Sequence, residues 1–252
     1  MYKISGIIIA KNEQNLIKGA LESLSFCDEI IVIDNESKDR TKEIAQKHKA
    51  KVYEFKSDSF SEMRNYGLSV ATYDWILYLD ADERISEELK ESIKNILADG
   101  SKHSAFFLKR RNYYFGKNEW PYVEKLERFF KKEKLKEWKG KLHESPVIDG
   151  DVGELEGHIL HLTHRDLESM VEKTIQWSET EALLRYNAGH PDVAWWRFPR
   201  VMISAFLSSY IKQRGYKAGA IGVIESMYQA FSIFITYAKL WELQHNQKAK
   251  NK

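Results

Sequence analysis

The chain has 252 residues, a formal net charge of +2, 43% hydrophobic residues and 30% charged residues. This composition is that of a globular protein and excludes a disordered or fibrous chain, and the near-neutral charge gives no argument for nucleic-acid binding. The single cysteine, Cys27, excludes an internal disulfide framework and a cysteine metal cluster, and it fits a reducing cytoplasm.

The first predicted element is a strand over Ile4–Ala10, a continuous and largely β-branched apolar run. This run is too short for the hydrophobic region of a secretory signal and too short to span a bilayer. We therefore expect the catalytic part of the chain to stay in the cytosol.

The first hundred residues alternate between the hydrophobic periods of strands and helices. A second β-branched run, Glu29–Ile33, predicts another buried parallel strand, and apolar residues at helical spacing over 16–24 predict a helix between the two. The same patterns then predict a short helix around 44–48, a strand at 52–55, a helix at 60–71 and a strand at 75–79. Four strands separated by helices predict a doubly wound, mainly parallel α/β sheet.

Polar clusters follow three of the predicted strands, at 11–13, 34–39 and 80–83. Ligands of doubly wound sheets bind beyond the carboxyl ends of the strands, so we expect the three clusters to line one crevice. Asp80 and Asp82 are carboxylates of the kind that Mg²⁺ or Mn²⁺ takes together with phosphate oxygens. The alternative is that both residues start a turn and cap the helix after Ser86.

Four motifs, in this order, resemble the signatures of family 2 glycosyltransferases of the GT-A fold. They are Ile7–Glu13, Ile31–Thr41, Met63–Gly67 and Leu79–Glu83. A further motif, Leu142–Glu144, together with His161–His164, is similar to the branch that includes bacterial lipopolysaccharide core β-1,4-glucosyltransferases. The resemblance implies a metal-dependent hexosyltransferase.

The resemblance also implies which residues bind the donor. They are Ala10, Asn12, Glu13, Asp34, Arg64, Asp80 and Ala81. Asp34 would meet the nucleobase or the ribose, Arg64 the phosphates or the sugar, and Asp80 the ribose or the metal. The chemistry gives an independent reason for carboxylates and an arginine at this site. A leaving diphosphate gains negative charge, which a bound cation and a guanidinium group stabilise. Taken singly, Asp34 and Asn12 could also be turn and cap residues, and Arg64 could be part of a surface ion pair.

The implied metal is Mg²⁺ or Mn²⁺, with Asp82 as its direct ligand. In some GT-A enzymes a histidine from the second half of the domain completes the metal shell, so His161 or His164 would take that role here. Imidazole is an acceptable ligand for Mn²⁺, although oxygen donors are preferred. The alternative for each histidine is an ordinary hydrogen-bonded polar residue.

An inverting transfer needs a base that takes the proton from the acceptor hydroxyl. Glu144 is our candidate, with His143 beside it to orient the carboxylate or to hydrogen-bond the acceptor. Both lie in a segment whose glycine and proline indicate a loop. The nearest competing carboxylates are Asp149, Asp151 and Glu154, and sequence alone leaves the choice open.

Residues 109–141 carry twelve Lys or Arg against five Glu, interleaved with aromatic residues, in predicted hairpins around 109–115 and 128–132. We interpret them first as an acceptor cleft, second as solvated hairpin faces, and only third as a nucleic-acid surface. We expect no nucleic-acid partner.

The last third is predicted to be helical. Asp166–Tyr186 has the pattern of an amphipathic helix that ends at an Asn-Ala-Gly-His-Pro stop signal. The apolar runs at 201–211 and 218–238 are predicted to be too short to span a bilayer. With neighbouring tryptophans and cations, residues 195–240 have the composition of helices that lie on anionic membranes. The alternative is a helical hairpin packed on the catalytic domain or on a second subunit, and a homo-oligomer stays open.

Together these inferences predict a GT-A catalytic domain over residues 1–165 and a helical extension over 166–252. The nucleotide-sugar half covers about 1–100 and the acceptor half about 101–165. The expected activity is inverting, metal-dependent transfer of a hexose, glucose first, from a UDP-sugar to a glycan or lipid-linked acceptor such as lipopolysaccharide core. It would take place at the cytoplasmic face of the plasma membrane. The alternative is a non-catalytic nucleotide-sugar-binding protein of the same fold.

Overall fold

The computed structural model describes residues 2–140 and 144–250, with side chains up to residue 246. Its contacts divide the chain into two compact units. Unit 1 comprises Met1–Arg111 and Val123–His161, and unit 2 comprises Asn112–Tyr122 and Leu162–Lys252. Residues 112–122, which we predicted in the acceptor half, therefore group with the C-terminal helices.

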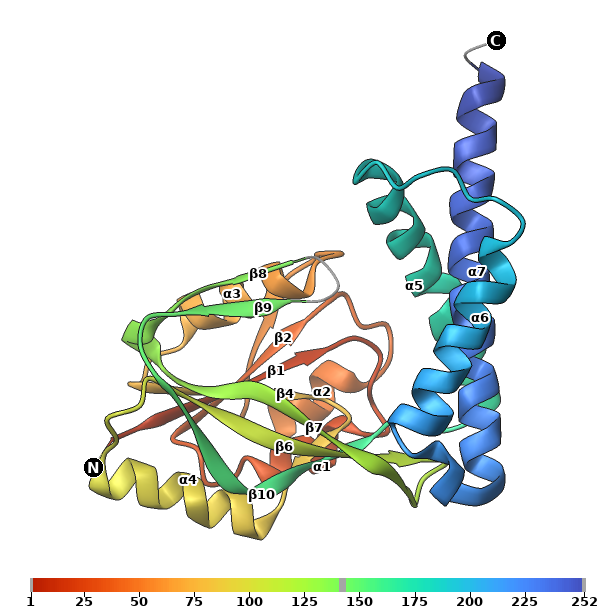
Figure 1. The fold of residues 1–252 in the computed structure, drawn as a ribbon. Coiled ribbons are helices and arrows are strands. Elements are labelled where there is room, and N and C mark those ends of the chain that lie inside the picture. Colours follow the sequence, from red (N-terminus) through yellow and green to blue (C-terminus); the bar gives the residue numbers. More distant parts are fainter. Residues whose placement is uncertain (1, 141–143, 251–252) are drawn as a thin grey trace. The chain divides into compact units, whose positions relative to one another are not determined.

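An eight-stranded sheet forms the centre of unit 1 (Figure 1). Its strands lie in the order β3-β2-β1-β4-β7-β6-β10-β5. Their bounds are β1 Ile4–Ala10, β2 Glu29–Asp34, β3 Lys51–Glu54, β4 Trp75–Asp80, β5 Glu83–Ile85, β6 Ala105–Tyr114, β7 Asn118–Lys131 and β10 Val152–Leu162. The first four strands pair in parallel, whereas β4–β7 and β5–β10 are antiparallel.

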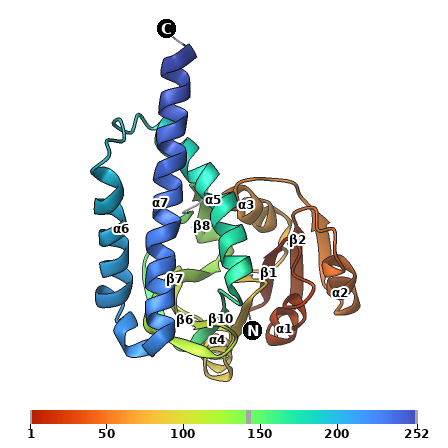
Figure 2. The same cartoon turned by 90° about the vertical axis from the view of Figure 1, so that its right-hand side faces the viewer.

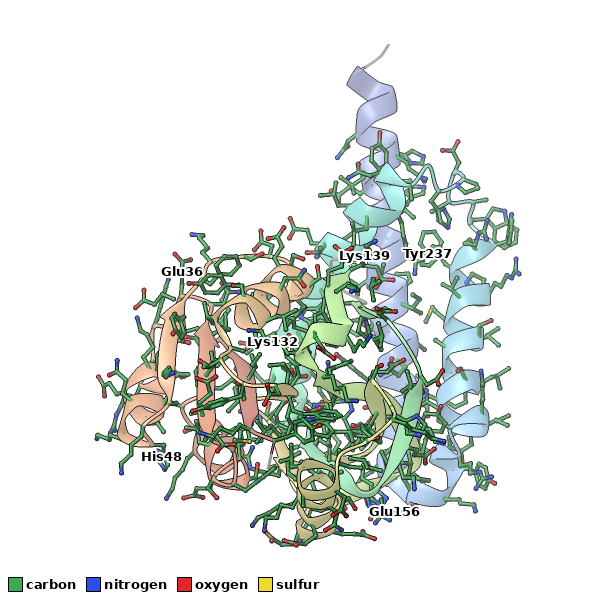
Figure 3. All side chains as sticks on the ribbon, turned by 90° about the vertical axis from the view of Figure 1, so that its left-hand side faces the viewer. Glu36, His48, Lys132, Lys139, Glu156 and Tyr237 are labelled. Carbon is green, nitrogen blue, oxygen red and sulfur yellow. The ribbon has the colours of Figure 1, made fainter. Side chains whose placement is uncertain are left out.

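Helices cover both faces of this sheet, and the period-two alternation of the strands supplies both faces with apolar side chains. In β1, Ile4 and Ile8 belong to one core, and Ile7 and Ile9 belong to the other. The first core lies under α1, α2 and α4, and the second lies under α3 and a small β8–β9 sheet (Figures 1 and 3). The bounds of these elements are α1 Ile17–Ser23, α2 Thr41–Lys47, α3 Phe60–Val70, α4 Glu87–Asp99, β8 Leu135–Lys139 and β9 Ser145–Ile148.

The predicted elements of the first hundred residues are confirmed and differ from the structure only at their ends. Ser86 caps the helix predicted after it, because its Oγ accepts a hydrogen bond from Leu89 N at 3.2 Å. The two hairpins predicted around 109–115 and 128–132 are instead one long hairpin of β6 and β7.

Unit 2 contains three long helices, α5 (Leu167–Asn187), α6 (Arg197–Leu207) and α7 (Gly219–Lys250). A π-helical turn over Ser208–Lys212 and a 3₁₀ turn over Gly215–Ala218 connect α6 to α7. Figure 2 shows α6 and α7 running side by side. Their small core consists of Ala182, Val193, Tyr237 and Leu240.

The length of the last helix corrects one prediction. The apolar run at 218–238 was expected to be too short for a bilayer, but in the described chain the helical segment Gly215–Asn246 is long and apolar enough to cross one, by length and composition alone. The run continues as a helix because no Gly or Pro interrupts it after Gly222. A single such helix is weak evidence for spanning, since the core helix of a globular protein can have the same composition.

Glu29 is a buried carboxylate at the start of β2 that connects three segments of unit 1. Its Oε1 accepts hydrogen bonds from Ser5 Oγ and Thr72 N, both at 2.6 Å, and its Oε2 accepts one from Lys51 Nζ at 2.8 Å. Burial alone would raise the pKa of Glu29, but the hydrogen bonds from Lys51, Ser5 and Thr72 outweigh burial and lower this pKa below its ordinary value of 4.5.

We expect Glu29→Gln to reduce the free energy of unfolding by about 1–3 kcal/mol at pH 7, because it removes charge-assisted hydrogen bonds and leaves buried donors poorly matched. The native pKa lies below the unfolded one, so this contribution is complete above the unfolded pKa and is lost as the pH falls through the native pKa. Urea denaturation at pH 7 and pH 3 should give a smaller difference between the two proteins at pH 3. Equal differences would contradict the assignment.

Candidate active site

The loops that follow β1 and β2 are held together by hydrogen bonds at the carboxyl edge of the sheet. Asn12, at a positive φ of 56°, donates from its backbone N to Ser37 Oγ at 2.9 Å, and its Oδ1 accepts from Lys38 N at 2.8 Å. The backbone N of Glu13 donates to Thr41 Oγ1 at 2.8 Å. Asn12 and Glu13 therefore position the loop after β2, and their predicted contact with a donor stays a prediction.

Asp34 is the last residue of β2 and is fully buried. Its Oδ2 accepts a hydrogen bond from Ser37 N at 2.9 Å, whereas its Oδ1 is buried without a hydrogen-bond partner among the described residues. A buried acceptor without a partner costs about 1–3 kcal/mol. This oxygen is thus a suitable acceptor for a donor group of a ligand.

Two predicted donor-binding residues, Ala10 and Ala81, have side chains in the core. They are 2% and 3% exposed and pack in the same apolar cluster. Ala10 O accepts from Asn35 N at 2.9 Å, and Ala81 O accepts from Arg84 Nη1 at 3.1 Å. Strand alternation and the turn direct both Cβ atoms inward, so the side chains of these residues are buried, and their predicted contact with the donor stays a prediction.

Arg64 connects two of the predicted carboxylates. Its Nη2 donates to Asp80 Oδ1 and its Nε donates to Glu144 Oε1, both at 3.0 Å. A second guanidinium, Arg128 of β7, lies beside them, with Nη2 3.4 Å from Asp80 Oδ2 and Nη1 4.0 Å from Glu144 Oε1. We call these four residues the arginine–carboxylate cluster. It brings together residues that are 80 positions apart in the chain.

The two guanidinium groups of this cluster are buried and lie over the ring of Trp138, at 4.9 Å for Arg64 and 5.8 Å for Arg128. Burial alone would raise the pKa of Asp80, but the charges of Arg64 and Arg128 outweigh it and lower this pKa far below its usual range. Arg64 Nη1 and Arg128 Nε are buried without hydrogen-bond partners in the described part of the chain. The cluster therefore contains two buried cationic N–H donors without an acceptor among these residues.

Sequence reasoning missed Arg128. The available signal was the strand alternation of β7, which places residue 128 on the same face as Phe130, and Phe130 packs in the same core as Trp138. A charged residue at a core-facing strand position indicates a buried partner.

Asp82 and His161 lie together in unit 1, with Asp82 Oδ2 3.3 Å from His161 Nε2. The antiparallel pairing of β5 with β10 causes this approach, because it sets His161 opposite Glu83. Burial alone would lower the pKa of His161, but the hydrogen bond with Asp82 and its charge outweigh burial and raise this pKa.

The pair of Asp82 and His161 fits a divalent cation of the predicted kind. Adjacent octahedral ligands, each about 2.1 Å from Mg²⁺ or Mn²⁺, lie about 3 Å apart, which is close to the 3.3 Å between these two atoms. Among the described residues no group of three or more His, Cys, Asp or Glu is placed to hold a metal. Phosphate oxygens and water would complete such a shell. Both oxygens of Asp80 face guanidinium groups, so we do not include it as a metal ligand.

Glu83 does not line the crevice, contrary to the prediction for the cluster at 80–83. It is fully buried, its Oε2 accepts from Asp80 N at 3.0 Å, and its Oε1 accepts from Arg110 Nη1 at 3.0 Å. Glu83 and Arg110 thereby fix the turn that carries Asp80 and Asp82.

Among the described residues, the remaining candidates for the catalytic base do not belong to the arginine–carboxylate cluster. His143 lies outside the described residues. Asp149 pairs with Lys134 and Lys136, each at 3.6 Å. Glu154 pairs with Lys125 and Lys109.

His164 belongs to unit 2, where its Nδ1 lies 2.8 Å from Glu225 Oε2 and its ring stacks on Tyr114. Its partners in unit 2 are thus a carboxylate and an aromatic ring, which is the arrangement of a hydrogen-bonded core histidine.

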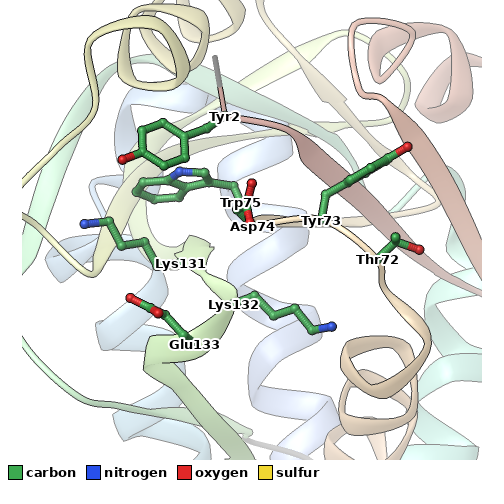
Figure 4. A pocket seen from close by; sticks show the side chains of 8 residues that line it. All are labelled: Tyr2, Thr72, Tyr73, Asp74, Trp75, Lys131, Lys132 and Glu133. Carbon is green, nitrogen blue, oxygen red and sulfur yellow. The ribbon is translucent and has the colours of Figure 1, made fainter.

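Unit 1 also has a hollow of about 510 Å³ at the opposite end of the strands (Figure 4). It is lined by Tyr2, Thr72, Tyr73, Asp74, Trp75, Lys131, Lys132 and Glu133. Trp75 is the first residue of β4 and Asp80 the last, so this hollow is separate from the candidate site.

Residues 5–147 match the model of glycosyl transferase family 2. The chain belongs to this family. An uncharacterized glycosyltransferase of Rickettsia typhi is 31% identical over 259 residues, covering 96% of this chain and 88% of the relative. The lipopolysaccharide core biosynthesis glycosyltransferase LpsC of Rhizobium meliloti is 26% identical over 98% of this chain and 94% of its own. The predicted family and transferase class are confirmed.

Two solved structures overlap with this chain at low sequence identity. TarS 1–349 of S. aureus has a TM-score of 0.47 at 16% identity, covering 97% of this chain and 92% of that one. Glucosyl-3-phosphoglycerate synthase of Mycobacterium tuberculosis, in complex with Mn²⁺, UDP and its product, has a TM-score of 0.46 at 18% identity, covering 76% and 81%. The chain is an α/β protein with a large, mainly parallel sheet and C-terminal helices, and the predicted GT-A fold is confirmed.

Proposed function

We propose that this family 2 glycosyltransferase moves a hexose, glucose first, from a UDP-sugar to a glycan or lipid-linked acceptor such as lipopolysaccharide core, with inversion and with a divalent cation. The observation that carries the proposal is the grouping at the carboxyl end of β4. There Asp82 approaches His161 at 3.3 Å, and Arg64 connects Asp80 to Glu144 at 3.0 Å on each side.

The donor diphosphate is assigned to the cationic side of this grouping. Asp82 and His161 would hold Mg²⁺ or Mn²⁺, which supplies charge stabilisation to the leaving diphosphate when bound. Arg64 Nη1 and Arg128 Nε, which have no partner among the described residues, are donors for its oxygens. Asp34 Oδ1 is the acceptor for a nucleobase or ribose N–H or O–H.

Glu144 is assigned as the general base. It removes the proton from the acceptor hydroxyl while the hydroxyl oxygen bonds to the anomeric carbon and the bond from that carbon to the diphosphate breaks. The hydrogen bond from Arg64 Nε fixes the orientation of the carboxylate. Attack from the face opposite the leaving group inverts the anomeric configuration.

The acceptor class is supported by the relative LpsC, which is named for lipopolysaccharide core biosynthesis. The proposed location is the cytoplasmic face of the membrane, with residues 195–240 in peripheral contact with lipid. Exposed apolar side chains in this segment support it, among them Trp195 at 81% and Ile203 at 58% exposed. Contact with a second copy of the chain is the alternative.

A hydrolysis screen of nucleotide sugars tests the proposal, because water replaces the acceptor slowly in such sites. We expect UDP-glucose to be broken down with Mn²⁺ or Mg²⁺ at least tenfold faster than other donors, and EDTA to stop the reaction until metal is restored. Binding of UDP-glucose without breakdown, even with lipopolysaccharide core added, would favour the non-catalytic binding protein. Turnover that persists in EDTA would refute the metal assignment.

A further inference from the structure

Unit 2 contains an open groove of about 420 Å³, which is lined by residues of α6 and α7. Figure 2 shows these two helices side by side. Its lining residues are Arg197, Arg200, Val201, Ser204, Ala205, Ile233 and Tyr237. Tyr237, labelled in Figure 3, comes from α7, and the two arginines come from the first turn of α6. The volume falls in the range of pockets that take small molecules or lipid portions.

One end of the groove is strongly cationic. The guanidinium groups of Arg197 and Arg200 both lie against the ring of Trp196, at 4.9 Å and 5.9 Å. Arg197 Nε is buried without a hydrogen-bond partner in the part of unit 2 that the structure describes. A third guanidinium, Arg185, lies 5.3 Å from the Tyr237 ring but is neutralised by Glu181, whose Oε1 accepts a hydrogen bond from Arg185 Nε at 3.1 Å. Arg197 and Arg200 thus place two like charges beside one ring, where they repel one another, and an anion between them is stabilising.

The rest of the groove is mainly apolar, because Val201, Ala205 and Ile233 line it. A free phosphate ion would use only the arginine end. An amphiphile that carries a phosphate and an alkyl chain would use both parts.

We propose that the α6–α7 groove binds one anionic phospholipid of the membrane, with its phosphate on Arg197 and Arg200 and an acyl chain along Val201, Ala205 and Ile233. The inference deepens the membrane contact of the proposed function and rests on it. A bound lipid neutralises the arginine pair and covers apolar surface, so the groove selects a lipid of net negative charge over a zwitterionic one.

Calorimetry of the full chain with dihexanoylphosphatidylglycerol, below its micelle concentration, tests this inference without sugar transfer. We expect one lipid per chain, with at least tenfold weaker binding of dihexanoylphosphatidylcholine and of inorganic phosphate. The double variant Arg197→Gln/Arg200→Gln should lower the affinity at least tenfold. Ser204→Phe, which fills the groove and changes no charge, should have the same effect and decides the matter if the arginine variant misfolds.

The matched control is Lys212→Gln/Lys217→Gln, which removes the same charge from exposed positions of unit 2 outside the groove. An equal loss in the control, or full affinity in both groove variants, would overturn the inference. Flotation with phosphatidylglycerol vesicles distinguishes failure of the groove proposal from failure of the proposed membrane contact. Flotation without binding of the soluble lipid refutes the groove alone, and absence of flotation refutes the membrane contact as well.

Discussion

Asp82→Ala is expected to lower the rate of sugar transfer at least about 10³-fold, which corresponds to about 4 kcal/mol of transition-state stabilisation. The reason is that Asp82 is the carboxylate nearest His161, so its loss leaves a single imidazole to hold the cation. The same change should weaken UDP binding only when Mn²⁺ is present, because the direct contacts of the nucleotide with protein are unchanged. Turnover of UDP-glucose and calorimetry of UDP with and without Mn²⁺ measure the two effects.

Asp149→Ala provides the matched control for this variant. It removes the same side chain from an exposed position, where the carboxylate lies 3.6 Å from Lys134 and Lys136. We expect both transfer and Mn²⁺-linked binding to stay within twofold of the unaltered protein. Undiminished Mn²⁺-linked binding in Asp82→Ala would remove Asp82 from the metal site.

The parallel half of the sheet was predictable because its signals are local. Each of the strands at 4–10, 29–34 and 75–80 is a short apolar run, and each is followed by polar residues at the edge where ligands bind. The order of these motifs along the chain also indicated the glycosyltransferase family. Patterns of this kind depend on residues within about ten positions of one another, so they can be recognised in a single sequence.

The remainder of the site depends on pairings that no local pattern encodes. His161 reaches Asp82 because β10 pairs with β5, and Glu144 reaches Asp80 through Arg64 of α3. Arg128 enters from β7, which pairs with β4 in antiparallel register. The sequence indicated which residues are candidates for the site, whereas the partners of each come from segments far away in the chain.

These pairings also give Asp80 and Asp82 different neighbours. Asp80 is the last residue of β4, and its side chain lies on the α3 face, where two guanidinium groups lower its pKa. Asp82 lies in the following turn and approaches an imidazole instead. One carboxylate thus contacts two guanidinium groups and the other contacts an imidazole, although the two aspartates are separated by a single residue.

Glu144→Gln should lower kcat by about 10²–10⁴-fold, the usual contribution of a general base, with little effect on UDP binding. The substitution is nearly isosteric, and its amide oxygen can still accept the hydrogen bond that Arg64 Nε gives to Glu144 Oε1 at 3.0 Å. The arrangement of the arginine–carboxylate cluster is therefore retained while the proton acceptor is lost. Transfer assays at saturating donor, together with UDP calorimetry, measure both quantities.

Glu154→Gln is the matched control for the base, since Glu154 was a competing candidate and pairs with Lys109 and Lys125 on the surface. A large loss of kcat in Glu154→Gln with normal turnover in Glu144→Gln would transfer the role to that carboxylate. A fall in UDP affinity that accounts for the whole loss in Glu144→Gln would instead make Glu144 a positioning residue for Arg64. Only a selective loss of kcat in Glu144→Gln, with donor binding retained, identifies the carboxylate as the group that takes the acceptor proton.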